Sequence, residues 1–257
     1  MEPQIRYVTS ADGTRIAMSS LGQGRPLVIL PTLWLSTIET YWQVPESRAN
    51  VERLAERRMV VTYDNRGYGL SEREVTDFSL EARVSDLTAV VDSVGSPVDL
   101  LAAQGYTGPT AISYTAKHPD RVGRLGLASG VARGRDMIVT PRQRALQHLI
   151  EVDWELYVQT QVLVSYGWTR SVAESLIDGV TSEAFLATVR SARQDDVTEL
   201  LPEVRCPMDR LPAAAARQPA APGAAARSRR GSLASRVPSV WDGQYTRPLW
   251  RPCGHRE

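Results

Sequence analysis

The sequence predicts an α/β fold, in which a mostly parallel sheet carries helices on its faces and a helical cap over one edge. Three observations lead to this prediction. Turn residues join two short alternating runs into an N-terminal hairpin. Between residues 27 and 128, short apolar runs alternate with segments of helical period, which is typical of a parallel sheet. From 140 to 201 the pattern is helical only, and these helices form either a cap or a layer packed on the core.

The composition limits the range of functions. The 257 residues are 42% hydrophobic and 23% charged, which suits a globular chain with a large core. The net charge of +1 argues against nucleic acid as a partner. No apolar run could span a membrane, and the N-terminus lacks a signal-peptide pattern, so we expect a cytoplasmic location without membrane contact. Cys206 and Cys253 lack zinc-site spacing, and we expect neither a metal nor a cofactor.

The first strands are predicted from alternation and turn residues. Residues 5–8 and 15–20 alternate as strands, and Asp12-Gly13 between them is a strong hairpin signal. Leu27 to Leu30 is a continuous apolar run, as expected of a strand buried on both faces. The loop Pro31 to Leu35 follows it. Ligands of open α/β sheets bind beyond such strand ends, so this loop is a candidate binding region.

Aromatic residues follow this loop at helix-like spacing, among them Trp34, Tyr41 and Trp42. Two interpretations stay open, a helix or loop packed on the core and an aromatic wall of a binding pocket. Met59 to Tyr63 is the next predicted strand, and a glycine-rich turn from Asp64 to Ser71 ends it. This turn lacks the GxGxxG order and the following helix of a phosphate-binding loop.

The clearest amphipathic helix spans Phe78 to Val94, and Ser79 can cap it. A strand–turn–helix unit comes next. An apolar run from Val98 to Ala103 leads into a small-residue turn at 105–108, and the helix after it stops at Pro119. This order is the frame of a nucleophile elbow, in which a reactive side chain sits on a tight turn above a parallel sheet.

The parts of the chain are predicted from these patterns. Residues 1–139 form the sheet core, 140–201 the helical cap, and 202–207 the start of a return to the core. Residues 208–257 hold ten alanines, nine arginines and six prolines without an apolar period, so we expect a disordered tail. The charge changes as well, because residues 1–207 carry 21 basic and 26 acidic side chains and the tail carries 9 and 3.

Two hypotheses account for the tail. Its basic charge would suit a regulatory module that touches nucleic acid. Its Arg/Ala/Pro richness also suits an out-of-frame reading of a GC-rich gene, in which case the last part of the core is missing. We favour the second hypothesis. It predicts an unprotected sheet edge, and therefore poor solubility or oligomerisation through that edge.

Four segments of the chain resemble one known family. They are Ser10-Ala11-Asp12-Gly13-Thr14, Tyr63-Asp64-Asn65-Arg66-Gly67-Tyr68-Gly69-Leu70-Ser71, Phe78-Ser79-Leu80-Glu81 and Ala116-Lys117-His118-Pro119-Asp120-Arg121-Val122. With these motifs, residues 6 to about 136 resemble the α/β-hydrolase superfamily, and more narrowly the bacterial hydrolase-fold domains found beside cyclase or LuxR-type regulatory domains. The resemblance implies the α/β-hydrolase fold and an esterase-like reaction.

The resemblance also implies positions for the reacting groups. Aligned on the His-Pro pair that ends the elbow helix, the G-x-S-x-G motif falls on residues 103–107, and Gly105 stands where the serine would be. Glycine has no side chain with which to attack. The oxyanion donors would be the backbone N–H groups of Leu33 and Tyr106. Trp34 and Tyr106 would line a pocket for a small apolar or ester-like ligand.

Substitutes for the missing groups are weak. Thr107 has a hydroxyl near the elbow, but a hydroxyl without a base is a poor nucleophile. Asp136 follows the strand after the elbow, where some relatives carry their acid. His148 lies on a cap helix, His118 belongs to the His-Pro turn, and His255 lies in the tail. A structural role is favoured for His118 and a surface or cap-packing role for His148, and a disordered tail would not hold His255 in a catalytic position.

Two functional hypotheses stay open. The favoured one is a degenerate hydrolase-fold protein without hydrolytic activity, either a ligand-sensing remnant or a truncated product. The alternative is an active, esterase-like carboxylic-ester hydrolase whose nucleophile the sequence does not identify. Absence of the serine and of a well-placed histidine favours the first, because loss of the triad removes several orders of magnitude in rate.

Overall fold

One sheet organises the protein. The structure is a computed structural model, and it describes residues 3–32, 37–95, 97–102, 105–128, 130–136, 141–165 and 169–211. Within these residues, seven strands form one sheet in the order β1-β2-β4-β3-β5-β6-β7. The strands are β1 (Gln4–Thr9), β2 (Arg15–Leu21), β3 (Pro26–Leu30), β4 (Met59–Tyr63), β5 (Val98–Ala102), β6 (Val122–Ala128) and β7 (Met208–Leu211).

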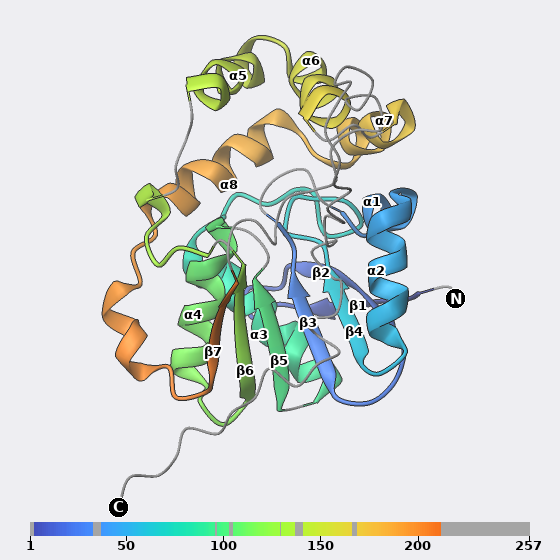
Figure 1. Cartoon of the computed structure of the whole chain (residues 1–257). Coiled ribbons are helices and arrows are strands. Elements are labelled where there is room, and N and C mark those ends of the chain that lie inside the picture. Colours follow the sequence, from blue (N-terminus) through green and yellow to red (C-terminus); the bar gives the residue numbers. More distant parts are fainter. Residues whose placement is uncertain are drawn as a thin grey trace, which may run out of the picture.

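The strand directions follow from the connections. The β1–β2 hairpin turns at Gly13, which has a φ of 91°, and the N–H of Thr14 donates to the Asp12 carboxylate at 3.0 Å. This side-chain turn fits the predicted Asp-Gly hairpin. β2 pairs antiparallel with β4, and the pairs from β4 through β3, β5 and β6 to β7 are parallel. The carboxyl ends of the parallel strands therefore meet at one edge of the sheet (Figure 1).

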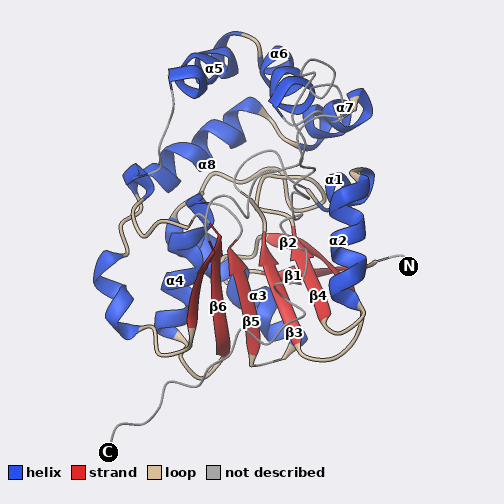
Figure 2. Ribbon diagram, in the orientation of Figure 1, coloured by secondary structure: helices blue, strands red, loops and turns tan. Residues whose placement is uncertain are grey.

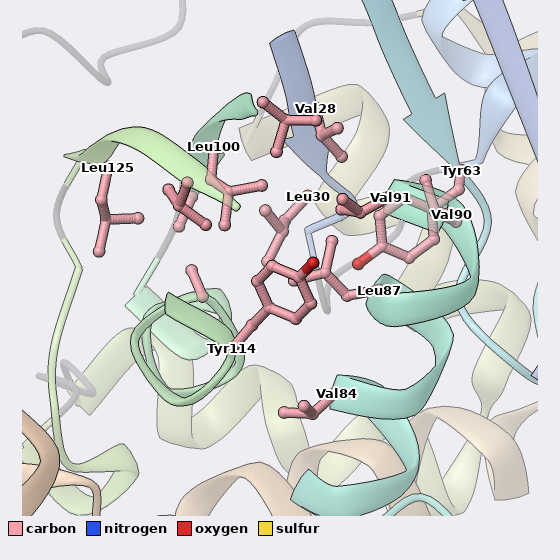
Figure 3. Packing of buried hydrophobic residues seen from close by; sticks show 14 of the residues in the cluster. Val28, Leu30, Tyr63, Val84, Leu87, Val90, Val91, Leu100, Tyr114 and Leu125 are labelled. Carbon is pink, nitrogen blue, oxygen red and sulfur yellow. The ribbon is translucent and has the colours of Figure 1, made fainter. Parts of the chain in front are cut away.

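Helices cover both faces of the sheet. They are α1 (Ile38–Gln43), α2 (Pro45–Ala55), α3 (Leu80–Val94) and α4 (Gly108–Lys117). The main core fills the space between the sheet and α3 and α4, where Val28 and Leu30 of β3 face Leu87 and Tyr114 (Figure 3). Leu27 of the same strand points to the opposite face, into the cluster with α2. β3 is thus buried on both faces, as its continuous apolar run predicts.

The aromatic residues after β3 have a structural role where the structure describes them. Tyr41 and Trp42 lie on α1 and pack, partly buried, against the cluster under α2. The core-packing interpretation therefore holds for these two side chains. Trp34 lies outside the described residues.

A second group of helices lies beyond the carboxyl edge of the sheet, above the strand ends (Figures 1 and 2). Its elements are α5 (Pro141–Val152), α6 (Trp154–Gln159), a π-helical turn (Thr160–Ser165), α7 (Arg170–Gly179) and α8 (Ser182–Gln194). Tyr157, Leu176 and Phe185, each 0% exposed, belong to the separate hydrophobic cluster of this group. We call these helices the cap.

The return from the cap differs from the sequence prediction at one point. The predicted tail begins at Met208, whereas Met208–Leu211 forms β7 and pairs in parallel with β6. The N–H of Leu125 donates to the Pro207 carbonyl at 3.0 Å, which starts the pairing. The prediction was wrong for these four residues because it rested on the composition of all fifty residues of the tail, to which a short strand contributes little. Residues 212–257 lie outside the described residues.

Candidate functional site at the carboxyl edge of the sheet

The elbow joins β5 to α4 at the centre of the carboxyl edge. β5 ends at Ala102, Gly105–Thr107 form a 3₁₀ turn, and α4 continues from Gly108. The side chains of Tyr106 and Thr107 are 1% and 2% exposed. The order of strand, turn and helix is the predicted one, and its tip carries a glycine. The backbone N–H of Tyr106 lies in this turn, and Leu33, the other expected oxyanion donor, lies outside the described residues.

A buried carboxylate organises the neighbouring turn after β4. Asp64 is 0% exposed and accepts two backbone hydrogen bonds, from Ile38 N–H at 2.6 Å and from Leu70 N–H at 2.8 Å. It thereby fixes the start of α1 to the glycine-rich turn. Burial raises the pKa of Asp64 to about 7, against the opposing effect of the two donors. Gly69 has a φ of 49°, and a Cβ there would collide with the Asp64 carboxylate.

Arg66, in the same turn, is the centre of a buried ion-pair network. Its guanidinium is 1% exposed and donates to both oxygens of Asp86 at 2.8 and 2.7 Å. It also donates to Asp12 in the β1–β2 hairpin at 2.8 Å. The hydrogen bond from Arg66 lowers the pKa of Asp12 to about 2. One cation thus ties the hairpin and α3 to the glycine-rich turn.

A second buried arginine connects the core to the cap. Arg83 on α3 is 4% exposed and pairs with Asp195, the residue that ends α8, at 2.7 Å. A second guanidinium nitrogen donates to the Thr110 hydroxyl, in the first turn of α4, at 3.2 Å. Sequence reasoning missed this contact. The available signal was a charged residue on the apolar stripe of α3, next to Val84 and one turn before Leu87.

Below the elbow lies a small polar cavity. Its volume is about 10 Å³, and it is lined by Leu30, Pro31, Tyr63, Asn65, Arg83, Asp86, Thr107 and Thr110. This volume holds about one water molecule and no ester. In the described part of the chain, no three His, Cys, Asp or Glu side chains gather where they could bind a metal ion. No described helix is long and apolar enough to cross a membrane.

The structure places the weaker candidates in three different environments. Thr107 is buried at the start of α4 and lines the small cavity. Asp136 is exposed and forms an ion pair with Arg133 at 2.7 Å. His148 is exposed on α5. The His118 ring is tilted by 40° against the Tyr114 ring, with ring centroids 4.7 Å apart, and burial lowers the pKa of His118. Trp34 and His255 lie outside the described residues.

An elbow of this kind, set between a parallel sheet and a helical cap, is the arrangement with which α/β-hydrolase-type proteins present a nucleophile. Sequence comparison makes the assignment specific. The chain belongs to the alpha/beta hydrolase family, whose pattern matches residues 27–255. The superfamily resemblance predicted from the motifs is thereby confirmed. The narrower link to cyclase- and LuxR-associated domains stays a prediction.

Relatives of the chain are distant. A protein assigned as the carbamate hydrolase RutD of Caulobacter sp. (strain K31) is 28% identical over 180 residues, which are 66% of this chain and 65% of the relative. Epoxide hydrolase B of Mycobacterium tuberculosis (strain H37Rv) is 31% identical over 150 residues, or 54% and 39% of the two chains. The chain thus spans less than two thirds of the length of these relatives.

Solved structures show the same fold. A bromoperoxidase from Bacillus anthracis superposes with a TM-score of 0.65 at 17% identity, over 81% of each chain. An esterase from Exiguobacterium antarcticum superposes with a TM-score of 0.62 at 20% identity, over 79% of this chain and 78% of the esterase. At such identities the likeness shows the fold alone.

Proposed function

We propose that this protein is an α/β-hydrolase-fold member that binds a small apolar or ester-like ligand at the carboxyl edge of the sheet without hydrolysing it. One observation carries the proposal. Gly105 lies in the turn between β5 and α4, where the family resemblance implies a nucleophile, and glycine offers no atom to attack with. The binding part rests on the elbow turn and the cap above it, and not on the cavity beside Thr107 and Thr110, which is too small for such a ligand.

The environments of the other candidates support the proposal. An acid that orients a catalytic base is normally buried beside it, whereas Asp136 is exposed and paired with Arg133. A general base must reach the proton of the nucleophile, and exposed His148 belongs to α5, which lies farther from the sheet than α8 (Figure 2). The described residues therefore offer no assembled substitute triad.

Ester turnover tests the catalytic half of the proposal. The full chain is assayed with p-nitrophenyl acetate and butyrate, and we expect rates equal to those of buffer with a non-enzymatic protein. Thr107→Val and His148→Ala are assayed in parallel. Turnover by the natural chain that either substitution abolishes would show an unconventional active site and overturn the proposal.

Ligand binding tests the other half. Short-chain methyl ketones, which are neutral and resemble esters without a leaving group, are titrated against the protein by calorimetry. We expect binding that strengthens with chain length as apolar area is buried. Absence of binding at every chain length would favour a truncated product over a ligand-binding protein.

The alternative, an active hydrolase, is favoured by one specific observation. The family match continues to residue 255 and so includes His255, a residue of the type that acts as base in this family. Gly105→Ser supplies the missing hydroxyl and separates the two functions. If Gly105→Ser gains ester turnover that His255→Ala removes, the tail supplies a base and the natural chain lacks only the nucleophile. Turnover by the natural chain that His255→Ala alone removes would support the active hydrolase.

A further inference from the structure

The chain leaves the core for the cap and returns to it through two adjacent segments. The N–H of Gly134 donates to the Asp195 carbonyl at 2.9 Å, and the N–H of Val197 donates to the Ala132 carbonyl at 3.0 Å. Arg133 and Asp196 between them form an antiparallel bridge. We call residues 131–134 and 195–197 the cap stem. The stem connects the cap to the core and lies beside the elbow helix.

The stem packs closely on its neighbours at two glycines. A Cβ on Gly108, the first residue of α4, would collide with the Val131 carbonyl. A Cβ on Gly134 would collide with the Ala192 carbonyl near the end of α8. Backbone therefore touches backbone on both sides of the stem, and small movements of the stem reach α4 directly.

Arg83 adds a polar connection at the same place. Its guanidinium donates to three different elements, namely the Phe78 carbonyl before α3 at 3.2 Å, the Thr110 hydroxyl at 3.2 Å and the Asp195 carboxylate at 2.7 Å. The side chains of Arg83 and Asp195 are 4% and 5% exposed. Breaking any of these contacts costs a hydrogen bond to a buried cation, and the cation's partners are therefore held in register.

We propose that Arg83 is a positioning residue that couples the cap to the elbow. A shift of the stem moves Asp195, Arg83 follows Asp195, and the contact with Thr110 passes the shift to the first turn of α4, five residues after Gly105. The elbow and the cap, which together enclose any ligand at this edge, then change position together. The coupling needs neither hydrolysis nor ligand binding and holds whether or not the proposed function is right.

Hydrogen exchange of the full chain, followed by mass spectrometry, tests the coupling without a ligand. Asp195→Asn keeps the shape of the side chain and removes its charge. We expect amide exchange to speed up by about tenfold both in the stem and in the first turn of α4. The effect on α4 should disappear when Thr110→Val is already present, because Arg83 then has no hydroxyl to hold there.

A matched control separates coupling from loosening of the cap. Leu176→Ala creates a cavity in the cap cluster, away from Arg83, and we expect faster exchange in the cap with no change in α4. If Asp195→Asn leaves α4 at its original exchange rate, or if Leu176→Ala speeds α4 equally, the proposal is wrong.

Reciprocity gives a second test should Asp195→Asn fail to fold. Thr110→Val preserves side-chain volume and breaks only the link to α4. Because coupling between two sites acts equally in both directions, Thr110→Val should speed exchange of the Gly134 and Val197 amides in the stem. Unchanged stem exchange in this variant would overturn the proposal independently.

Discussion

Two turns at the carboxyl edge of the sheet make a useful comparison. The turn after β4 contains Asp64 and Arg66, both buried and both bonded to several elements. The turn after β5, which is the elbow, has Gly105 at its tip. The first turn is held by buried charged side chains that bind several elements, whereas the second has no side chain at its tip. The residues that stabilise this edge are therefore different from the residue at the elbow tip.

The largest expected effect lies in the turn after β4. Arg66→Met removes both ion pairs and leaves Asp86, whose side chain is 3% exposed, buried without its cation. We expect a loss of about 3–5 kcal/mol in the free energy of unfolding, measured by urea denaturation. Arg121→Met breaks the exposed pair with Asp92 and should cost less than about 1 kcal/mol. Equal losses in the two variants would contradict the scaffold role of the turn.

The pH dependence of stability isolates Asp64. Burial raises its pKa to about 7 in the folded protein from an ordinary value of 3.8, so the unfolded chain loses its proton at lower pH than the folded chain. Stability is then fully present below pH 3.8 and falls as the pH rises to 7, by on the order of 4 kcal/mol.

Asp64→Asn should remove this dependence. The amide does not titrate, but it has one acceptor oxygen where Asp64 uses two, so the variant loses one backbone hydrogen bond and should be the less stable protein near pH 4. The difference should shrink or reverse by pH 8, because only the natural chain loses stability as the pH rises, as measured by denaturation at both values. The Asp12 carboxyl does not affect this comparison, because its lowered pKa changes the stability only between about pH 2 and pH 3.8. If the free energies of unfolding of the two proteins differ by a constant amount from pH 4 to 8, the raised pKa of Asp64 is refuted.

Beside the elbow, packing rather than charge sets the expected effect. Gly108→Ala places a methyl group against the Val131 carbonyl and should destabilise the protein by about 1–3 kcal/mol. Gly179→Ala is the control, because a Cβ there meets Thr37 Cγ2 at an ordinary 3.6 Å. Thermal unfolding of both variants measures the difference. If Gly108→Ala is as stable as the natural chain, the stem can move away from α4 at this point.

The smallest expected effect is at the elbow tip. The family motif that this segment resembles carries a serine where Gly105 stands, so we expect the turn to accept a side chain. Gly105→Ser should change the free energy of unfolding by less than about 1 kcal/mol. A loss of several kcal/mol would mean that the elbow turn is packed around glycine and has no room for a side chain at position 105.

Local pattern was enough to predict most of the fold. Strands such as β3 and β4 are continuous apolar runs, and the cap of α3 at Ser79, which accepts from Ala82 N–H at 3.2 Å, has a residue type that signals a helix start. The sequence pattern failed to predict a helix boundary where a hydrogen bond from the backbone to a side chain starts a new helix. Asp153 caps α6 by accepting from Leu156 N–H at 2.9 Å, so the helical pattern that follows residue 140 is divided there into α5 and α6.

The site was less predictable than the fold, for a physical reason. The place of Gly105 in the elbow can be predicted from the motif that the segment resembles. The contact of Arg83 with Asp195 cannot, because it joins residues 112 positions apart. Neither residue has a local signature that identifies its partner. Burial of Asp64 is likewise set by α1 and the glycine-rich turn together, so its raised pKa is a property of the assembled edge.

The stem has an evolutionary consequence. Because Ala132 and Val197 are joined by a hydrogen bond, the intervening segment begins and ends at one point of the molecule. A segment with adjoining ends can be exchanged for another of different length without stretching the chain. The whole cap is in this sense a replaceable module, which a graft of another cap onto residues 132 and 197 could exchange without altering the sheet.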